Sequence, residues 1–261
     1  MTSTILRDQV ANVDLATPPE YQVHGSGEPL VYVCGIEGTG LNFFKQLPDL
    51  INDHQIITYP LRPTGKYGLE QLVADLAWIL RDAGIERATL IGESFGGLVV
   101  QAMALAHPQA VNQIILVNTF ATFLNPLKVK VGLALYSWLP LWLVTKYRSS
   151  RSGAELFSDD IEEPDRARFL RNTSTVGLEG YLSRLRIIRD TNLLPRLHQI
   201  EVPALVVTST ADRMLDAMTS GRAMAEQLPR ARVRVLEGTG HCALLSNRVR
   251  VRDWLKELAN V

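Results

Sequence analysis

The chain has 261 residues, of which 46% are apolar, and its 27 lysines and arginines equal its 27 aspartates and glutamates. This length suits one large α/β domain and is short for two. The apolar content excludes an intrinsically disordered chain, and the balanced charge argues against a nucleic-acid partner.

The sequence gives no sign of export or membrane insertion. Met1–Val10 lacks the apolar stretch of a signal peptide. The longest uncharged apolar run, Val131–Thr145, contains Pro140 and is shorter than the roughly 20 residues that span a bilayer. The two cysteines, Cys34 and Cys242, indicate neither a disulfide framework nor a metal site. We therefore expect a cytoplasmic protein with no integral membrane segment, no metal and no cofactor.

Short β-branched segments alternate with helical patterns, which favours a mainly parallel sheet flanked by helices. In chain order, strands are expected at Tyr21–His24, Leu30–Cys34, Gln55–Tyr59, Ala88–Ile91, Gln113–Val117, Ala204–Thr208 and Val233–Leu236. Helices are expected at Leu41–Ile51, at Leu69–Ala83, from Phe95 to about His107, and at Leu244–Ala259. We predict one α/β domain over residues 1–261.

The alternation stops between Phe120 and His198. Leu124–Val144 is rich in leucine and aromatic residues, and Tyr147–Asp190 is dense in arginines and acids. Because this insertion follows a strand of a parallel sheet, we interpret residues 120–198 as a helical cap over the site; the alternative is a helical extension on the flank of the sheet. The charged half is expected to form a solvated, salt-bridged surface, with recognition of an anionic carrier such as a phosphopantetheine thioester as the alternative.

The segment Gly92-Glu-Ser-Phe-Gly-Gly97 stands between an expected strand and an expected helix. A serine at such a tight turn projects its hydroxyl above the sheet, and glycines two residues before and after it avoid collisions. The helix would direct its free N–H groups, that of Phe95 first, towards a developing oxyanion. We therefore predict that Ser94 is a nucleophile; the alternative is that it only turns the chain.

A serine nucleophile needs a base, and His241 is the candidate. It follows the last expected strand through a glycine-containing loop, at the sheet edge where α/β proteins form their sites. An ordinary loop histidine is the alternative. Solvated or capping roles are expected for the other histidines, which are His24, His54, His107 and His198.

The base needs an orienting acid, and Asp212 stands four residues beyond the strand Ala204–Thr208. Along the chain the serine comes first, then the acid, then the histidine. This order is typical of hydrolases that carry their serine at such a strand-to-helix turn. Asp216 is the competitor, but we expect it to cap the next helix. The other possible acid position, after the preceding strand, holds Asn118, which cannot serve.

A glycine-rich loop, Gly35-Ile-Glu-Gly-Thr-Gly40, follows the strand Leu30–Cys34. Such a loop can direct a backbone N–H, here that of Ile36, towards the substrate oxygen, opposite the N–H of Phe95. A plain glycine turn is the alternative.

The four segments together resemble the α/β-hydrolase superfamily from about Tyr21 to the end of the chain. Many members carry His-Gly where this chain has Cys34-Gly35, so the role of that histidine is absent. The loops at Gly35–Gly40, Gly92–Gly97 and Ala211–Leu215 more narrowly resemble the phytyl ester synthase branch. That resemblance implies esterase or acyltransferase activity on long-chain lipid esters, although the additional acyltransferase domain of the plant members is lacking.

We expect a serine hydrolase that cleaves a carboxylic ester with an apolar acyl or alcohol group through an acyl-enzyme. A thioesterase or acyltransferase would use the same residues, and a non-catalytic small-molecule receptor is an alternative on this fold. The apolar residues from Leu124 to Leu143 recur at helical spacing, and most are expected to pack the cap on the sheet. Part of the cap must face Ser94, so Trp138 and Trp142 are expected substrate contacts. Glu37, in the glycine-rich loop, is expected to be a third. No partner other than a small-molecule ester is expected, and the sequence does not indicate the oligomeric state.

Cys34 ends the strand before the oxyanion loop, and Cys242 follows His241. Because both loops must converge on Ser94, we predict that the two cysteines lie near the site as buried, free thiols.

Overall fold

The computed structural model describes residues 18–138, 156–173 and 177–259. Within these ranges seven strands form one sheet in the order β1-β3-β2-β4-β5-β6-β7. Only β1 is antiparallel to its neighbour; the other strands are parallel. The strands are β1 (Gln22–His24), β2 (Glu28–Val33), β3 (His54–Thr58), β4 (Ala88–Glu93), β5 (Val111–Val117), β6 (Ala204–Ser209) and β7 (Ala231–Leu236). The expected mainly parallel sheet is confirmed.

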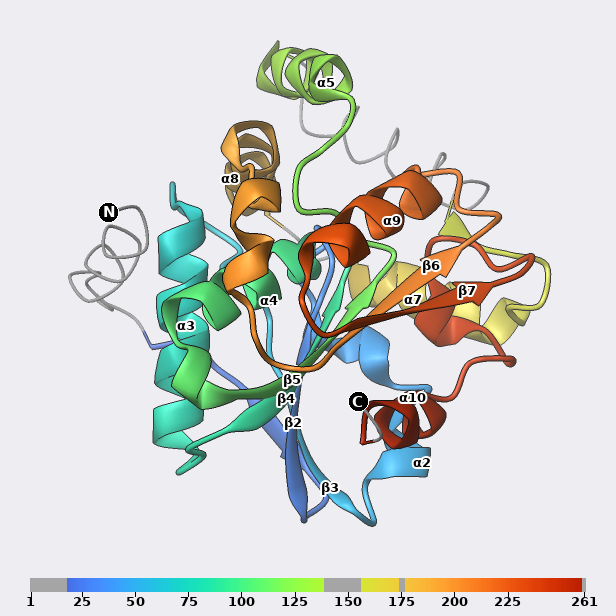
Figure 1. Ribbon diagram of the computed structural model, residues 1–261. Helices are drawn as coiled ribbons and strands as arrows, with labels where there is room; N and C mark the ends of the chain where they lie inside the picture. The colour runs from blue at the N-terminus through green and yellow to red at the C-terminus, as the bar shows by residue number, and fades with distance from the viewer. Residues whose placement is uncertain (1–17, 139–155, 174–176, 260–261) are drawn as a thin grey trace.

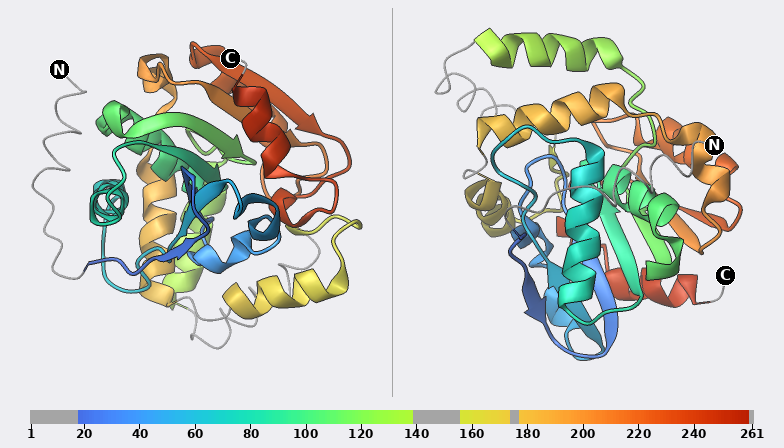
Figure 2. Two further views of the ribbon diagram at one scale, coloured as in Figure 1. Left: turned by 90° about the horizontal axis from the view of Figure 1, so that it is seen from below. Right: turned by 90° about the vertical axis from the view of Figure 1, so that its left-hand side faces the viewer.

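Helices cover both faces of the sheet (Figures 1 and 2). On one face α3 (Leu69–Asp82) packs on α4 (Phe95–Ala106), which lies against β2, β4 and β5. On the other face α10 (Val251–Leu258) packs on α2 (Leu47–Leu50). The helix α9 (Ala217–Gln227) packs on the last two strands, β6 and β7.

The burial pattern explains this arrangement. Every residue of β4 and every residue of α4 is buried, as their almost uninterrupted apolar sequences require. By contrast, α3 is amphipathic, and β7 at the edge of the sheet is largely exposed. The central position of β4, with Gly92 opposite Val33 of β2 and Leu116 of β5, places the end of this strand in the middle of the molecule.

The insertion between β5 and β6 contains α5 (Pro126–Trp138), α7 (Glu163–Thr173), α8 (Leu178–Asp190) and the 3₁₀ helix η3 (Leu194–Gln199). Helices α5 and α8 pack on each other, with the rings of Tyr136 and Tyr181 at 5.6 Å, and lie together at the top of Figure 1. The insertion touches the loop after β3 through a hydrogen bond from the N–H of Gly180 to the oxygen of Pro63. It also touches the loop after β7, where the N–H of Cys242 donates to the oxygen of Leu156.

Two expected helices are shorter than predicted. Leu41–Ile51 divides into the 3₁₀ helix η1 (Gly40–Phe43) and α2, because Pro48 starts a new helical turn. The last helix begins at Val251 rather than at Leu244, because Ser246 has an extended backbone after the 3₁₀ helix η4 (Ala243–Leu245). The remaining short 3₁₀ helix is η2 (Pro108–Ala110).

The predicted packing of the apolar stripe is wrong for three of its residues. Leu124, Leu127 and Val131 are 51%, 68% and 50% exposed. Leu124 precedes α5, and α5 turns Val129 and Leu133 inward in place of Leu127 and Val131. Trp138 ends α5, but its side chain and the whole of Trp142 lie outside the described part of the structure. Among the described helices, none has the length and apolar character to cross a membrane.

Candidate active site

Ser94 occupies the turn between β4 and α4 and has a backbone φ of 53° and ψ of −122°. This left-handed conformation is uncommon for a side chain larger than glycine, and it persists because the surrounding structure holds it. The N–H of Ser94 donates to the oxygen of Val117 at 2.9 Å, and the hydroxyl of Thr119 donates to the oxygen of Ser94. Ser94 is partly exposed at the end of β4.

The close packing around Ser94 leaves no room for a side chain at Gly92 or Gly96. A Cβ on Gly92 would lie 2.7 Å from the Cα of Gly97, and a Cβ on Gly96 would lie 2.1 Å from the oxygen of Val33. Both distances are below any normal contact, so the strand and helix can approach this closely only with glycine at these positions. The local sequence therefore dictates the tight turn that presents Ser94.

His241 lies between Ser94 and Asp212. Its Nε2 atom is 2.9 Å from Oγ of Ser94, and its Nδ1 atom is 2.7 Å from Oδ2 of Asp212. The other carboxylate oxygen of Asp212 accepts hydrogen bonds from the N–H groups of Met214 and Leu215, at 2.8 and 3.0 Å. The acid is thereby held in one orientation, and the three side chains form one hydrogen-bonded chain.

The carboxylate of Asp212 controls the charge of His241. Burial alone would lower the pKa of His241, but the charge and hydrogen bond of Asp212, with a contribution from Glu93, outweigh it and raise the pKa. The imidazole is therefore a stronger base than a free histidine, as proton abstraction from a serine requires.

The glycine-rich loop passes directly over the serine. A Cβ on Gly35 would lie 3.4 Å from Cβ of Ser94 and 3.9 Å from its Oγ. The N–H of Gly38 donates to the oxygen of Gly35, which closes a tight turn around Ile36 and Glu37. Ile36 follows Gly35 in this turn, and Phe95 begins α4 immediately after Ser94.

Asn118 is a residue of the site whose role the sequence did not reveal. It is fully buried, has a φ of 42°, and donates through Nδ2 to the oxygens of Gly240 and His241, at 3.1 and 2.9 Å. The same amide lies 2.9 Å from Oγ of Ser209. The side chain thus ties the end of β5 to the histidine loop. Its position at a strand end was visible in the sequence, but its contacts were not.

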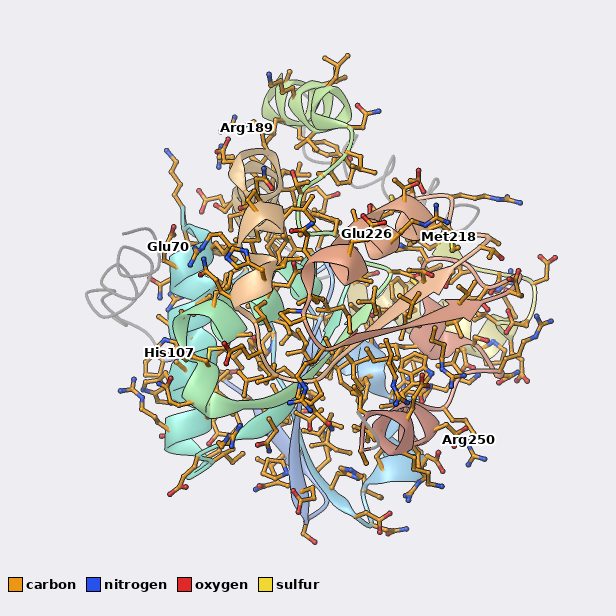
Figure 3. All side chains as sticks on the ribbon, viewed as in Figure 1. Glu70, His107, Arg189, Met218, Glu226 and Arg250 are labelled. Carbon is orange, nitrogen blue, oxygen red and sulfur yellow. The ribbon has the colours of Figure 1, made fainter. Side chains whose placement is uncertain are left out.

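The competing candidates lie elsewhere. Asp216 caps α9 and accepts from the N–H of Thr219, as expected. His107 ends α4, at the opposite end of the helix from Ser94 (Figure 3). His24 lies in β1 with its Nε2 atom 3.2 Å from Oγ1 of Thr58. His54 lies at the start of β3, and His198 lies exposed in η3.

Both cysteines are buried and free, as predicted. Burial raises the pKa of Cys34 to about 12 and raises the pKa of Cys242 well above its ordinary value. The thiol of Cys34 contacts the oxygen of Tyr59, and Cys242 stands next to His241. Neither thiol is therefore a nucleophile at neutral pH.

A cavity of about 440 Å³ lies beside Asp212. Phe120, Phe123, Met214 and Leu215 contribute apolar walls on one part of this cavity, and Arg213 and Asp216 contribute charged side chains on another.

Known proteins resemble the chain over most of its length. The 3-oxoadipate enol-lactonase 2 of Acinetobacter baylyi is 26% identical and covers 89% of each chain. A proposed carbamate hydrolase, RutD of Azorhizobium caulinodans, is 25% identical over 85% of this chain and 87% of that protein. A thermophilic esterase from Thermogutta terrifontis has the same fold, with a TM-score of 0.76, 20% identity, and coverage of 92% of this chain and 93% of the other.

A family match agrees with the topology and with the serine turn. Residues 28–248 match the family described as alpha/beta hydrolase fold, and this span runs from β2 to the loop before α10. The chain belongs to the alpha/beta hydrolase fold family.

Proposed function

We propose that the protein is a serine hydrolase that cleaves a carboxylic ester through an acyl-enzyme. The observation that carries this proposal is the hydrogen-bonded chain from Ser94 Oγ through His241 to Asp212. A serine hydroxyl is a weak nucleophile by itself, and a base oriented by a carboxylate is the arrangement that activates it. The esterase and the enol-lactonase among the similar proteins support ester chemistry.

The steps follow from the positions of these groups. His241 removes the hydroxyl proton as Ser94 Oγ attacks the ester carbonyl, and Asp212 stabilises the imidazolium. The N–H groups of Ile36 and Phe95 bind the negative oxygen. The intermediate collapses when His241 gives the proton to the leaving alcohol, and the acyl group stays on the serine. A water molecule then attacks the acyl carbonyl and His241 takes its proton. The bond between the acyl carbon and Ser94 Oγ breaks, His241 returns the proton to Oγ, and the free acid leaves.

We propose that the substrate carries an apolar acyl or alcohol group, because Phe120, Phe123, Met214 and Leu215 line one part of the cavity beside Asp212. Residues 120–198 would act as the cap on this site, since the insertion contacts the loops after β3 and β7. Trp138, Trp142 and Glu37 remain the proposed substrate contacts. Of these, Glu37 is partly buried in the turn beside Ser94.

A substrate series tests the proposal. p-Nitrophenyl esters of two to sixteen acyl carbons, with acyl-thioesters of the same lengths, are incubated with the protein and with Ser94→Ala. Faster hydrolysis of medium or long esters than of acetate, lost in Ser94→Ala, is the expected result. Preference for thioesters would indicate a thioesterase, and transfer of the acyl group to an added alcohol would indicate an acyltransferase. No turnover of any substrate would favour the receptor alternative.

A further inference from the structure

Arg184, on the inner side of α8, is a buried charge that pairs with no carboxylate in the described part of the chain. Its side chain is fully buried, and its Nε atom donates to the oxygen of Gly180 at 3.0 Å. Its Nη2 atom reaches only the oxygen of Arg62, at 3.4 Å. Across the described residues, Nη1 has no hydrogen-bond partner and no carboxylate forms an ion pair with this guanidinium. An unpaired buried charge costs several kcal/mol, so this arginine requires a reason.

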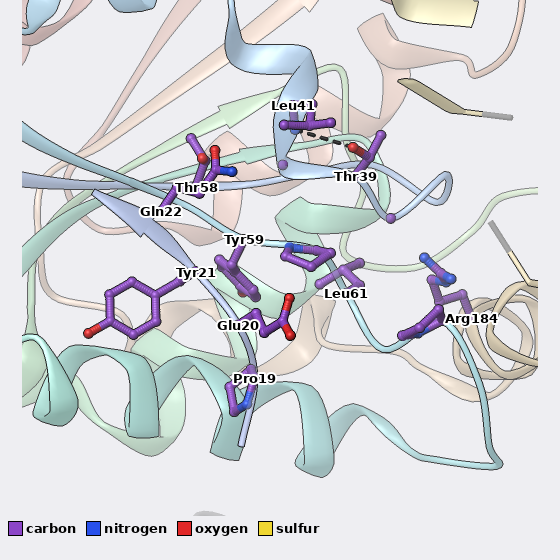
Figure 4. A pocket seen from close by; sticks show the side chains of 14 residues that line it. Pro19, Glu20, Tyr21, Gln22, Thr39, Leu41, Thr58, Tyr59, Leu61 and Arg184 are labelled. Atoms are coloured by element: carbon purple, nitrogen blue, oxygen red, sulfur yellow. Dashed lines mark hydrogen bonds between the residues drawn. The ribbon is translucent and has the colours of Figure 1, made fainter. Parts of the chain in front are cut away.

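Arg184 is among the residues that line a cavity of about 590 Å³ (Figure 4). Leu41, Leu61 and Pro63 contribute apolar walls to this cavity. Tyr59 also lines it, and the hydroxyl of Tyr59 is a second buried polar atom that lacks a partner within the described ranges. Ser94, Asp212 and His241 are not among the residues that line this cavity.

The backbone next to Arg184 leaves room for the charged group. Gly38 has a φ of 74°, and a Cβ at this position would lie 1.8 Å from Nη1 of Arg184. Only glycine allows the guanidinium to lie against this turn. The arginine therefore occupies a fitted position between the cap insertion and the Gly35–Gly38 turn.

The expectation of a solvated surface is wrong for this residue, although it holds for another arginine of the same helix. Arg189 forms an ion pair with Asp190 and lies on the outer surface (Figure 3). Helix α8 thus turns one arginine outward to an acid and another inward to a cavity.

We propose that Arg184 and Tyr59 bind the carboxylate of a small amphipathic molecule in this cavity. A guanidinium and a phenol hydroxyl can both donate to one carboxylate, and charge-assisted bonds of this kind are short and strong. A single carboxylate fits better than a phosphate dianion, because Arg184 is the only cation among the lining residues and Glu20 also lines the cavity. The apolar walls would hold the hydrocarbon part of the ligand.

Benzoate and its neutral counterpart benzamide are the probes. Binding to the full-length protein is measured by calorimetry and by the shift in melting temperature. Benzoate should bind and stabilise both the wild-type protein and Ser94→Ala, and benzamide should bind at least tenfold more weakly. Because the Ser94→Ala protein is included, the result is independent of the proposed ester hydrolysis.

Two variants and two matched controls identify the residues. Arg184→Met should weaken benzoate binding tenfold or more, and Tyr59→Phe several-fold. Tyr21→Phe is the control for the phenol, because Tyr21 lines the same cavity but its hydroxyl donates to Asp82. Arg196→Met is the control for the guanidinium, because Arg196 also has unpartnered nitrogens in the described structure but does not line the cavity.

The melting temperature of the Arg184 variants without ligand shows whether Arg184 binds a ligand or only stabilises the fold. Removing an unpaired buried charge should leave the melting temperature of Arg184→Met unchanged or higher. If Arg184→Met does not fold, Arg184→Lys keeps a charge but loses the planar fork, and it should still weaken benzoate binding. Equal binding of benzoate to wild type and both Arg184 variants, or no binding to wild type at the solubility limit, would overturn the proposal. Equal loss of binding in Arg196→Met would also overturn it.

Discussion

The hydroxyl of Tyr32 donates a 2.6 Å hydrogen bond to the carboxylate of Glu93, the residue that precedes Ser94. Both side chains are buried. Burial raises the pKa of Glu93, and the Tyr32 hydrogen bond and the nearby His241 oppose that rise. In turn, the charge of Glu93 contributes to the raised pKa of His241. Glu93 and His241 are therefore electrostatically coupled.

This coupling predicts a change in pH dependence. His241 must be neutral to accept a proton, so kcat/KM should rise with pH through an inflection above the ordinary histidine pKa of about 6.5. Glu93→Gln removes a charge that raises the pKa of His241, so the inflection should move to lower pH. The pH profile of ester hydrolysis measures the effect, with Glu70→Gln on the surface of α3 as the control (Figure 3). An unchanged inflection, or one moved to higher pH, would contradict the coupling.

Substitutions should separate the proposed acid from its competitor. Ser94→Ala and His241→Ala should each lower turnover by roughly 10⁴-fold or more, because the two residues act as a unit. Asp212→Asn should lower turnover somewhat less. Asp216→Asn should keep near-normal turnover, since an asparagine caps a helix as well as an aspartate does. Steady-state hydrolysis of a p-nitrophenyl ester gives the comparison. If Asp216→Asn were inactive and Asp212→Asn active, the assignment of the acid would be wrong.

Asn118→Asp tests the contacts that hold the histidine loop. The carbonyl oxygens of Gly240 and His241 need a donor, and a carboxylate would repel them. The variant should lose about 2 kcal/mol or more of stability and most of its activity. Asn192→Asp is the matched control, because Oδ1 of Asn192 only accepts, from the N–H of Leu194, and a carboxylate can still do so. Urea unfolding and kcat/KM of both variants are compared. Similar values for the two variants would show that the Asn118 amide is dispensable.

The buried cysteines should react slowly. With a pKa of about 12, Cys34 holds on the order of a thousandfold less thiolate than a thiol of pKa 9, and Cys242 is shifted in the same direction. Iodoacetamide should therefore modify the native protein far more slowly than the urea-unfolded protein. Alkylation that does reach Cys242 should block activity by crowding His241, and a bound substrate analogue should prevent it. Mass spectrometry beside the esterase assay measures both, and full modification of Cys242 with intact activity would rule out this placement.

The sequence predicted the features that depend on local pattern. Ser94, Asp212 and His241 each follow a strand closely, and the ends of parallel strands meet at one edge of the sheet, so their convergence could be expected. The sequence showed only that Asn118 cannot serve as the acid. It did not show that the Asn118 amide donates to backbone oxygens of the histidine loop, because that loop is more than a hundred residues away.

Arg184 illustrates a second limit of prediction from the sequence. Arginines among acids ordinarily indicate a solvated surface, but Arg184 is buried, with its guanidinium against Gly38. In the same way, the apolar stripe on α5 was expected to pack, but helical periodicity does not say which side of a helix meets a partner. Such features depend on tertiary contacts that composition and spacing do not determine.

The central claim is that Ser94 is the nucleophile, and a fluorophosphonate tests it most directly. The reagent attaches covalently to an activated serine, and peptide mass spectrometry identifies the modified residue. We expect one adduct, on Ser94, formed together with loss of esterase activity. The adduct should be absent in Ser94→Ala and strongly slowed in His241→Ala. Intact wild-type protein that remains unlabelled, or labelling of another serine that abolishes activity, would contradict the account.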